Sequence, residues 1–266
     1  MKKYLIVLVF IVANSFGQEM NSNTAIDADT THWRGIRNRI IDQTSFIKMN
    51  ETGENYLKRA ELYQQIQDWK NALSDLNNAD KLMQNNISVF YARGGVKERL
   101  NDLQGAFSDF SKVISLFPDL EWAYHDRALI EMKLKKYYEA DLDLKKALKL
   151  KPNWEIAIFT QGTLADNKGE SEKAIGFFKR TLELQPKNYM AYNNIGKLYN
   201  ILGENDLAIE YLNKAIATNY KYSRPYVIRA KIKFDKGDKS GACQDLNIAI
   251  GLGNQDAMKN YDNYCK

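Results

Sequence analysis

The chain has 266 residues, of which 44% are hydrophobic, 12% aromatic and 27% charged, the composition of a soluble packed protein. Its formal net charge is +5, from 38 lysine and arginine residues against 33 aspartate and glutamate residues, and no basic run is interleaved with aromatic residues. This balance argues against binding to nucleic acid. The sequence also lacks a metal-ligating His/Cys pattern, a glycine-rich phosphate loop and a nucleophile motif, so we expect no catalytic residue, no metal site and no cofactor.

The N-terminal segment has the pattern of an export signal. Lys2 and Lys3 precede the apolar run Tyr4–Ala13, which is too short to span a bilayer comfortably. Ser15 and Gly17 are small residues at the −3 and −1 positions of a cleavage site, so we expect cleavage after Gly17. Residues 1–17 therefore predict bacterial export to the periplasm or the exterior, with no stable membrane span after cleavage. The alternative is an uncleaved anchor.

Residues 18–52 combine a polar stretch with an apolar pattern. Gln18–Thr31 is rich in Asn, Thr, Ser and Asp and predicts a flexible linker. From about His32 to Met49, apolar residues recur at roughly helical spacing: Trp33, Ile36, Ile40 and Ile47. We expect a short helix there that covers the exposed apolar face of the element that follows.

A period of 34 residues dominates the rest of the chain. It is marked by six alanines: Ala72, Ala106, Ala140, Ala174, Ala208 and Ala242. Twelve residues before each alanine stands a small residue: Ala60, Gly94, Ala128, Gly162, Gly196 and Ala230. Four residues after it stands a large apolar one: Leu76, Phe110, Leu144, Phe178, Leu212 and Leu246. This period predicts stacked helix–turn–helix units, in which small residues let two helices approach and large residues fill the space between them.

The ends of the helices follow the same register. Twelve residues after the alanine, three units carry a proline that stops the second helix: Pro118, Pro152 and Pro186. Asn219 and Gly253 are expected to end the second helix of the last two units through a left-handed conformation. A turn with a positive φ is expected inside each unit, at Gln67–Asp68, Asn101–Asp102, Lys135–Lys136, Gly169–Glu170, Gly203–Glu204 and Gly237–Asp238.

These residues resemble the tetratricopeptide repeat (TPR) family, whose unit is 34 residues long. The resemblance covers residues 53–256 as six repeats in unbroken register: 53–86, 87–120, 121–154, 155–188, 189–222 and 223–256. It implies an all-α fold, a right-handed superhelical solenoid of about six repeats, each with a helix A and a helix B. Gln255–Lys266 is expected to be helical, so that 257–266, beyond the repeats, forms a C-terminal capping helix.

One charged pairing recurs with the period. Aspartate stands three residues after the alanine in repeats 1, 2, 3 and 6: Asp75, Asp109, Asp143 and Asp245. Arginine stands thirteen residues before the alanine in the same repeats: Arg59, Arg93, Arg127 and Arg229. Both are lost together in repeats 4 and 5. A pair between neighbouring repeats would leave Asp143 and Arg229 without partners, so we expect an ion pair between helix A and helix B of one repeat.

The two cysteines lie near the C-terminus, Cys243 in the last helix B and Cys265 in the cap. At a rise of 1.5 Å per residue, each is about 14 Å from the turn that joins these two helices. In an exported chain, cysteines at matching depth predict a disulfide, and two buried free thiols are the alternative. The closed loop of about 22 residues predicts roughly 3 kcal/mol of chain-entropy stabilisation.

The resemblance implies a concave ligand groove lined by helix A, at the second, fifth, ninth and twelfth residues of each repeat. The candidate groove residues in repeats 2 to 4 are aromatic: Tyr91, Trp122, His125 and Phe159. Those in repeats 5 and 6 are polar or basic: Asn193 with its neighbour Asn194, Lys197, Arg224 and Lys231. A protein or peptide segment with an apolar anchor and an acidic end would match them. The alternative is that the aromatic side chains pack against neighbouring repeats.

We therefore expect an exported, non-enzymatic scaffold that binds a protein or peptide partner in this groove. The carboxylate clamp of chaperone-binding TPR domains is not expected, because only Asn194 and Arg224 fit its five positions. A glycan-binding module is the second hypothesis, with Tyr91, Trp122 and Phe159 as stacking platforms for sugars. A cryptic hydrolase and a structural envelope protein that self-associates along its convex face as a homo-oligomer are further hypotheses.

Overall fold

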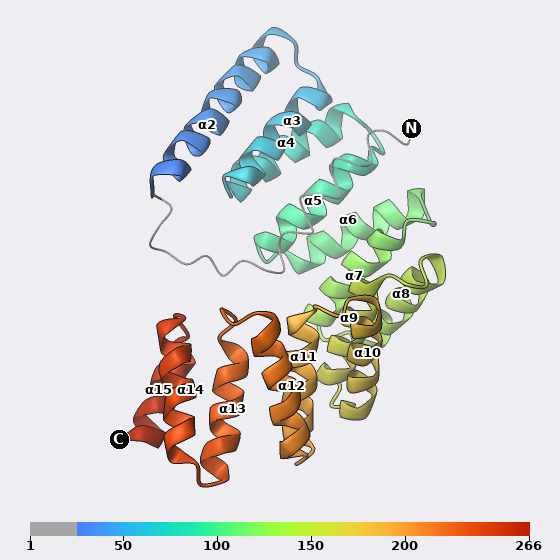
Figure 1. Ribbon diagram of the computed structural model, residues 1–266. Helices are drawn as coiled ribbons and strands as arrows, with labels where there is room; N and C mark the ends of the chain where they lie inside the picture. Colours follow the sequence, from blue (N-terminus) through green and yellow to red (C-terminus); the bar gives the residue numbers. More distant parts are fainter. Residues whose placement is uncertain (1–25) are drawn as a thin grey trace.

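The computed structural model describes residues 26–266, with side chains from His32 onward; the expected export signal lies outside the described residues. The described residues form fourteen α-helices and no strand. Figure 1 shows the helices stacked in chain order along a curved array, with α2 at one end and α15 at the other. Their bounds are α2 (Ile26–Met49), α3 (Gly53–Gln65), α4 (Trp69–Leu82), α5 (Ile87–Arg99), α6 (Leu103–Leu116), α7 (Glu121–Lys133), α8 (Tyr137–Leu150), α9 (Glu155–Asn167), α10 (Ser171–Leu184), α11 (Tyr189–Ile201), α12 (Asn205–Thr218), α13 (Arg224–Asp235), α14 (Lys239–Gly251) and α15 (Gln255–Cys265).

The helices from α3 to α14 form six consecutive pairs, one inside each predicted 34-residue repeat. The odd-numbered member of each pair is helix A and the even-numbered member is helix B. Helices A of successive repeats approach each other, α7 with α9 and α11 with α13, which places helix A on the inner side of the curve (Figure 1). The prediction of an all-α superhelical repeat fold is confirmed.

Two residues after the end of each helix A, the first residue of every predicted turn has a positive φ: Gln67, Asn101, Lys135, Gly169, Gly203 and Gly237. The left-handed residue expected at Gly253 is also present, with a φ of 82°. The same expectation for Asn219 is wrong, because its φ is −147°. Its side-chain Oδ1 instead accepts a hydrogen bond from the backbone N–H of Lys221 at 3.1 Å, a local turn that ends the helix without a left-handed residue.

Helix A and helix B of each repeat fit together by size. A Cβ atom added to Gly94 would lie 2.9 Å from the ring of Phe110, and one added to Gly162 would lie 2.7 Å from the ring of Phe178. In repeats 1, 3 and 6 the helix A residue is alanine and the helix B residue is the smaller leucine. These five repeats therefore keep a similar combined volume of the two side chains, as expected in an interior packed to crystal-like density, whereas repeat 5 combines Gly196 with Leu212.

The predicted ion pairs between helix A and helix B are confirmed in repeats 1, 2, 3 and 6. In repeat 2, Nε and Nη2 of Arg93 donate to the two oxygens of Asp109 at 3.0 and 2.8 Å. Nη1 of the same arginine reaches helix B of the preceding repeat, where it donates to Asp80 at 2.8 Å. The other three arginines reach back in the same way: Arg59 to Thr44, Arg127 to Ser111 and Arg229 to Asn213. Each arginine thus joins three helices.

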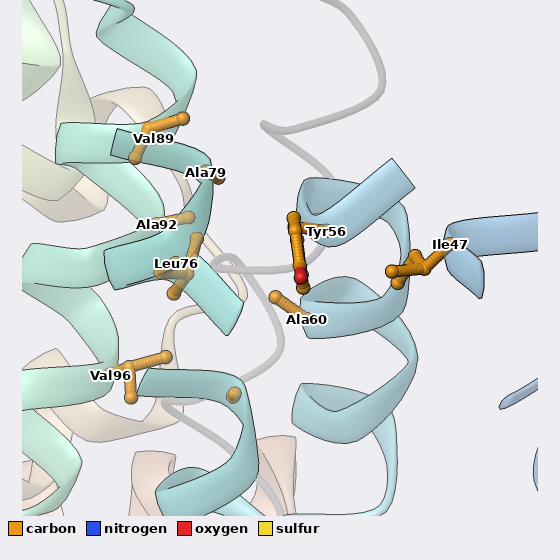
Figure 2. Packing of buried hydrophobic residues seen from close by; sticks show 9 residues of the cluster. Ile47, Tyr56, Ala60, Leu76, Ala79, Val89, Ala92 and Val96 are labelled. Carbon is orange, nitrogen blue, oxygen red and sulfur yellow. The ribbon is translucent and has the colours of Figure 1, made fainter. Parts of the chain in front are cut away.

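The N-terminal helix α2 stands where a preceding helix B would stand for repeat 1. Thr44 supplies the contact to Arg59 that helix B residues supply in later repeats. Figure 2 shows Ile47 of α2 on one side of α3, whose Tyr56 and Ala60 face Leu76 of α4 on the other side. The first repeat is therefore covered by an apolar contact from α2.

The predicted linker Gln18–Thr31 is wrong for residues 26–31, because α2 begins at Ile26 rather than near His32. Adding residues to an existing helix requires fixing one residue for each new hydrogen bond, whereas starting a helix fixes several residues for the first bond. A polar composition next to a stable helix therefore does not stop the helix from extending into it.

The C-terminal helix α15 packs against α14 and is joined to it by a disulfide between Cys243 and Cys265, with their Cα atoms 5.8 Å apart. α15 begins at Gln255, inside the last two residues of the predicted sixth repeat. The ring of Tyr264 stacks on that of Phe234 in α13, with centroids 4.2 Å apart. The cap therefore contacts both helices of the last repeat.

Reduction of this disulfide is expected to lower the free energy of unfolding by about 2 kcal/mol. The effect is smaller than the chain-entropy value because an end repeat opens without the rest of the array. Urea unfolding with and without a reductant measures it, and the double variant Cys243→Ser, Cys265→Ser, which should not respond to reductant, is the control. Unchanged unfolding after both thiols have become open to alkylation would contradict the prediction.

Candidate functional site

The candidate groove residues on helix A differ in exposure. His125 and Asn193 are 5% and 3% exposed, so a ligand reaches either side chain only where neighbouring side chains move aside. Arg224 and Lys231 are exposed, and the remaining five are half-buried: Tyr91, Trp122, Phe159, Asn194 and Lys197. Ligand contact by these nine residues stays a prediction, while the contacts they make within the protein show which of them have unused binding capacity.

A hydrogen-bonded ladder links helix A of repeats 2, 3 and 4. Tyr91 Oη donates to Asp126 Oδ2 at 2.7 Å, and Nδ1 of His125 lies 2.9 Å from Oδ1 of the same carboxyl group. Nε2 of His125 lies 3.0 Å from Oγ1 of Thr160. In the steps from Tyr91 to Asp126 and from His125 to Thr160, the fifth residue of one repeat meets the sixth residue of the next. Burial, with the neighbouring Asp126, raises the pKa of Tyr91 and keeps its hydroxyl group a donor.

The aromatic candidates each pack against another aromatic ring of the protein. The ring centroids of Tyr91 and Trp122 are 4.3 Å apart, with the ring planes at 68°. The ring centroid of Phe159 lies 5.1 Å from that of the buried Phe178. Stacking of a sugar needs a free ring face, so this packing counts against the glycan hypothesis.

The ladder stops after repeat 4, because the next two steps lack the side-chain groups for it. In the step from repeat 4 to repeat 5, the fifth residue is Phe159, which has no polar group for Asn194. In the step from repeat 5 to repeat 6, the sixth residue is Ile228, which has none for Asn193. Nδ2 of Asn193 donates to Oδ1 of Asn194 at 3.3 Å. Oδ1 of Asn193 is buried and has no hydrogen-bond partner among residues 32–266. Oδ1 of Asn193 is therefore the buried atom among the candidate groove residues that has unused hydrogen-bonding capacity, and leaving such a group unpaired costs about 1–3 kcal/mol.

The basic end of the groove is partly neutralised within the protein. Nζ of Lys197 forms an ion pair with Asp166 on the preceding helix A. Nζ of Lys231 lies 3.0 Å from Asp235, one helical turn away on the exposed surface. Arg224, at the start of α13, is exposed. An acidic group of a ligand would therefore compete with Asp166 for Lys197 and would meet Arg224 directly.

Sequence reasoning missed Asp126 and Thr160, because it considered the second, fifth, ninth and twelfth residues of each repeat. The structure shows that the sixth residue completes each step of the ladder. A usable signal was present, since the polar pairs Tyr91/Asp126 and His125/Thr160 are each separated by 35 residues, one more than the period.

No three His, Cys, Asp or Glu side chains within residues 32–266 lie close enough together to hold a metal ion. In the described part of the chain, no helix has both the length and the apolar character of a membrane span.

Comparisons with known proteins find the same repeat. Family models described as tetratricopeptide repeat match residues 123–153 and 177–210. No curated protein sequence matches the chain significantly.

Solved structures extend the similarity over most of the chain. A tetratricopeptide repeat protein from Parabacteroides merdae superposes with a TM-score of 0.72 at 19% identity, covering 88% of this chain and 93% of that chain. YrrB, described as a TPR protein with an unusual peptide-binding site, superposes with a TM-score of 0.55 at 23% identity, covering 69% of this chain and 95% of that chain. The Cut9–Hcn1 hetero-tetramer superposes with a TM-score of 0.69 at 15% identity, covering 98% of this chain and 52% of that chain.

The family-model matches lie inside the array, and the array consists of six helix pairs that share one 34-residue register. TPR arrays generally serve as protein-interaction scaffolds rather than as enzymes. On these observations, the chain is a tetratricopeptide repeat protein.

Proposed function

We propose that the chain binds an extended peptide segment of a partner protein in its helix A groove, centred on Asn193 and Asn194. The observation that carries the proposal is the buried, unpaired Oδ1 of Asn193 beside a second amide. A carboxamide has an acceptor oxygen and two N–H donors, the same kinds of group as a peptide bond. Two adjacent amides therefore suit a peptide backbone, whose N–H and C=O groups both need partners.

The surroundings of the two amides add apolar and charged contacts for peptide side chains. Phe159 is half-buried on the preceding helix A and supplies apolar surface. Lys197 lies one helical turn after Asn193, and Arg224 opens the next helix A with an exposed guanidinium group. A peptide with an apolar residue and an acidic residue beyond it fits this order. The shared fold with YrrB, whose peptide-binding site is named in its description, supports a peptide ligand for the fold.

We also propose that the protein works outside the cytoplasm, in the periplasm or after secretion. The export pattern of residues 1–17 supports this location, and so does the disulfide between Cys243 and Cys265, since disulfides persist mainly in oxidising compartments. N-terminal sequencing of the exported protein should begin at Gln18, and retention of the whole protein inside the cell would reject the proposal.

The double variant Asn193→Ala, Asn194→Ala is expected to bind groove peptides at least about tenfold more weakly, because it loses the two amide partners. Peptides are first selected on the parent chain from a displayed random library, and their affinities are then measured by fluorescence anisotropy. The variant removes the unpaired Oδ1 of Asn193 together with the hydrogen bond between the two amides, so its urea unfolding is measured beside the parent to separate loss of binding from unfolding.

The matched control is Asn247→Ala, which removes an exposed amide from helix B of the last repeat and should leave peptide affinity unchanged. Selected peptides that bind the double variant as tightly as the parent would remove the two amides from the site. Failure to select any peptide would reject peptide binding in the groove.

A further inference from the structure

The outward face of α8 differs from that of every other helix B in the array. The outward residues of each helix B are spaced four, three and four apart, and on α8 they are Tyr138, Leu142, Lys145 and Lys149. Tyr138 and Leu142 are 72% and 50% exposed. The other five repeats have only polar residues or glycine at these two positions. Two large apolar side chains one turn apart on an otherwise polar surface mark an interaction face.

The outward face of α12 has the complementary character. Its four residues at the same spacing are Asp206, Glu210, Asn213 and Ala217, and all four are exposed. Two carboxylates occupy its N-terminal half and a small residue ends it, with no basic residue in the stripe. The outward faces of α8 and α12 therefore carry opposite charges at matching spacing.

We propose that the chain self-associates head to tail, with the outward face of α8 in one copy packed antiparallel against the outward face of α12 in another copy. The spacing of four, three and four reads the same in both directions, so an antiparallel arrangement keeps all four positions in register. It sets Lys149 against Asp206 of the second copy and Lys145 against Glu210 of the second copy. Tyr138 then covers the small Ala217, and Leu142 lies beside Asn213.

Other arrangements of these faces fit less well. A parallel arrangement of α8 and α12 would set Tyr138 against Asp206 and Lys149 against Ala217, which removes both charge pairs. The outward face of α10 also carries acidic residues, Glu172 and Glu183. Packed antiparallel, it would set Glu183 against Tyr138 and Lys179 against Leu142, so apolar side chains would face charges. Among these arrangements, only the antiparallel pairing of α8 with α12 sets opposite charges against each other and places the large Tyr138 on the small Ala217.

Ion pairs within the chain do not prevent this contact. Lys145 is 2.6 Å from Asp141, and Glu210 is 2.6 Å from Lys214, each pair on its own exposed helix surface. Asp206 pairs with Lys236 at 2.5 Å while its side chain stays 92% exposed. Solvent screens exposed pairs of this kind and makes them weak, so the same charges can also form ion pairs with a second copy.

The contact uses two different surfaces, so each copy in a pair keeps one unused α8 face and one unused α12 face. Such a heterologous contact builds open chains unless the rotation between copies closes a ring. One helix face on another buries less than the roughly 1,200 Å² of a stable interface, so association should be weak and concentration-dependent. The peptide groove lies on helix A, on the other side of the array, and stays open.

The test reverses the charges on each face in turn. One variant carries Lys145→Glu and Lys149→Glu, and the other carries Asp206→Lys and Glu210→Lys. Sedimentation of the full chain, over concentrations up to about 0.5 mM, should show the weight-average mass of the parent rising about twofold or more. Each variant alone should lose this rise, because its two faces then carry like charges.

An equimolar mixture of the two variants should regain the rise, since the reversed α8 of one then meets the reversed α12 of the other. The control Lys239→Glu, Lys259→Glu makes the same change in net charge as the α8 variant, at exposed sites outside both faces, and should associate like the parent. A parent mass that does not depend on concentration would overturn the proposal. Association that persists in either charge-reversed variant alone, for example through the apolar run Tyr4–Ala13, would also overturn it. The same holds for a mixture of the two variants that does not regain the rise in mass.

Discussion

Replacing Asp109 by alanine is expected to lower the free energy of unfolding by about 3 kcal/mol. Asp109 is buried, accepts two hydrogen bonds from Arg93 and forms an ion pair with Lys97 at 2.7 Å. The substitution removes the carboxylate that pairs with both cations and leaves them partly buried. Asp80 still pairs with Arg93, but Lys97 loses its partner. Urea unfolding at neutral pH measures the loss.

A double-mutant cycle with Arg93→Ala and Asp109→Ala should give a coupling energy above about 1 kcal/mol, because the two residues share one buried contact. The control cycle uses Lys231 and Asp235, an exposed pair at 3.0 Å, and should give less than about 0.5 kcal/mol. Coupling energies of equal size in the two cycles would mean that burial does not strengthen the repeated pair.

Replacing Glu131 by glutamine is expected to raise the free energy of unfolding at pH 8 by up to about 3 kcal/mol. Glu131 is 4% exposed, and its Oε2 has no hydrogen-bond partner among residues 32–266. Burial, together with the nearby Asp143 carboxylate, raises the pKa of Glu131 from 4.5 to about 7, and Arg127 opposes that rise. Repeats 2 and 6 have Lys97 and Lys233 at this position, each paired with the aspartate of its own repeat.

The sign of the pH dependence follows from the raised pKa. Between pH 4.5 and about 7 the folded chain holds a proton on Glu131 that the unfolded chain has lost, so stability falls as the pH rises through this window. Below pH 4.5 both states are protonated and the penalty is absent; above about 7 both states are charged and it is complete.

The measurement is urea unfolding of the parent and of Glu131→Gln at pH 5 and pH 8. The variant should gain most of its added stability at the higher pH. Glu183→Gln, which neutralises an exposed carboxylate on α10 outside the surroundings of Glu131, should leave the pH dependence of the parent unchanged and is the control. A Glu131→Gln variant that follows the same pH dependence as the parent would contradict the assignment.

The repeat architecture could be predicted from the sequence because the features that build it lie within one 34-residue unit. The small residue of helix A, such as Gly94, and the large residue of helix B, such as Phe110, are sixteen residues apart, and each limits the size of the other. The joint loss of arginine and aspartate in repeats 4 and 5 likewise identified the partners of the ion pair.

The third contact of each arginine was missed, although part of it follows the period. Asn77, Ser111 and Asn213 each stand sixteen residues before the arginine that donates to them. The other acceptors, Thr44 and Asp80, stand at different distances along the chain and leave no periodic signal.

The sequence by itself determined the fold and the face of helix A on which the candidate groove residues lie, because helix faces follow from local spacing. Only the tertiary structure decided which of those residues have capacity left for a ligand. Asn193 has an unpaired oxygen because Ile228 follows it 35 residues later, whereas His125 at the same position of its repeat meets Thr160. Burial and pairing of these side chains depend on individual residues in neighbouring repeats, and a period records only what the repeats share.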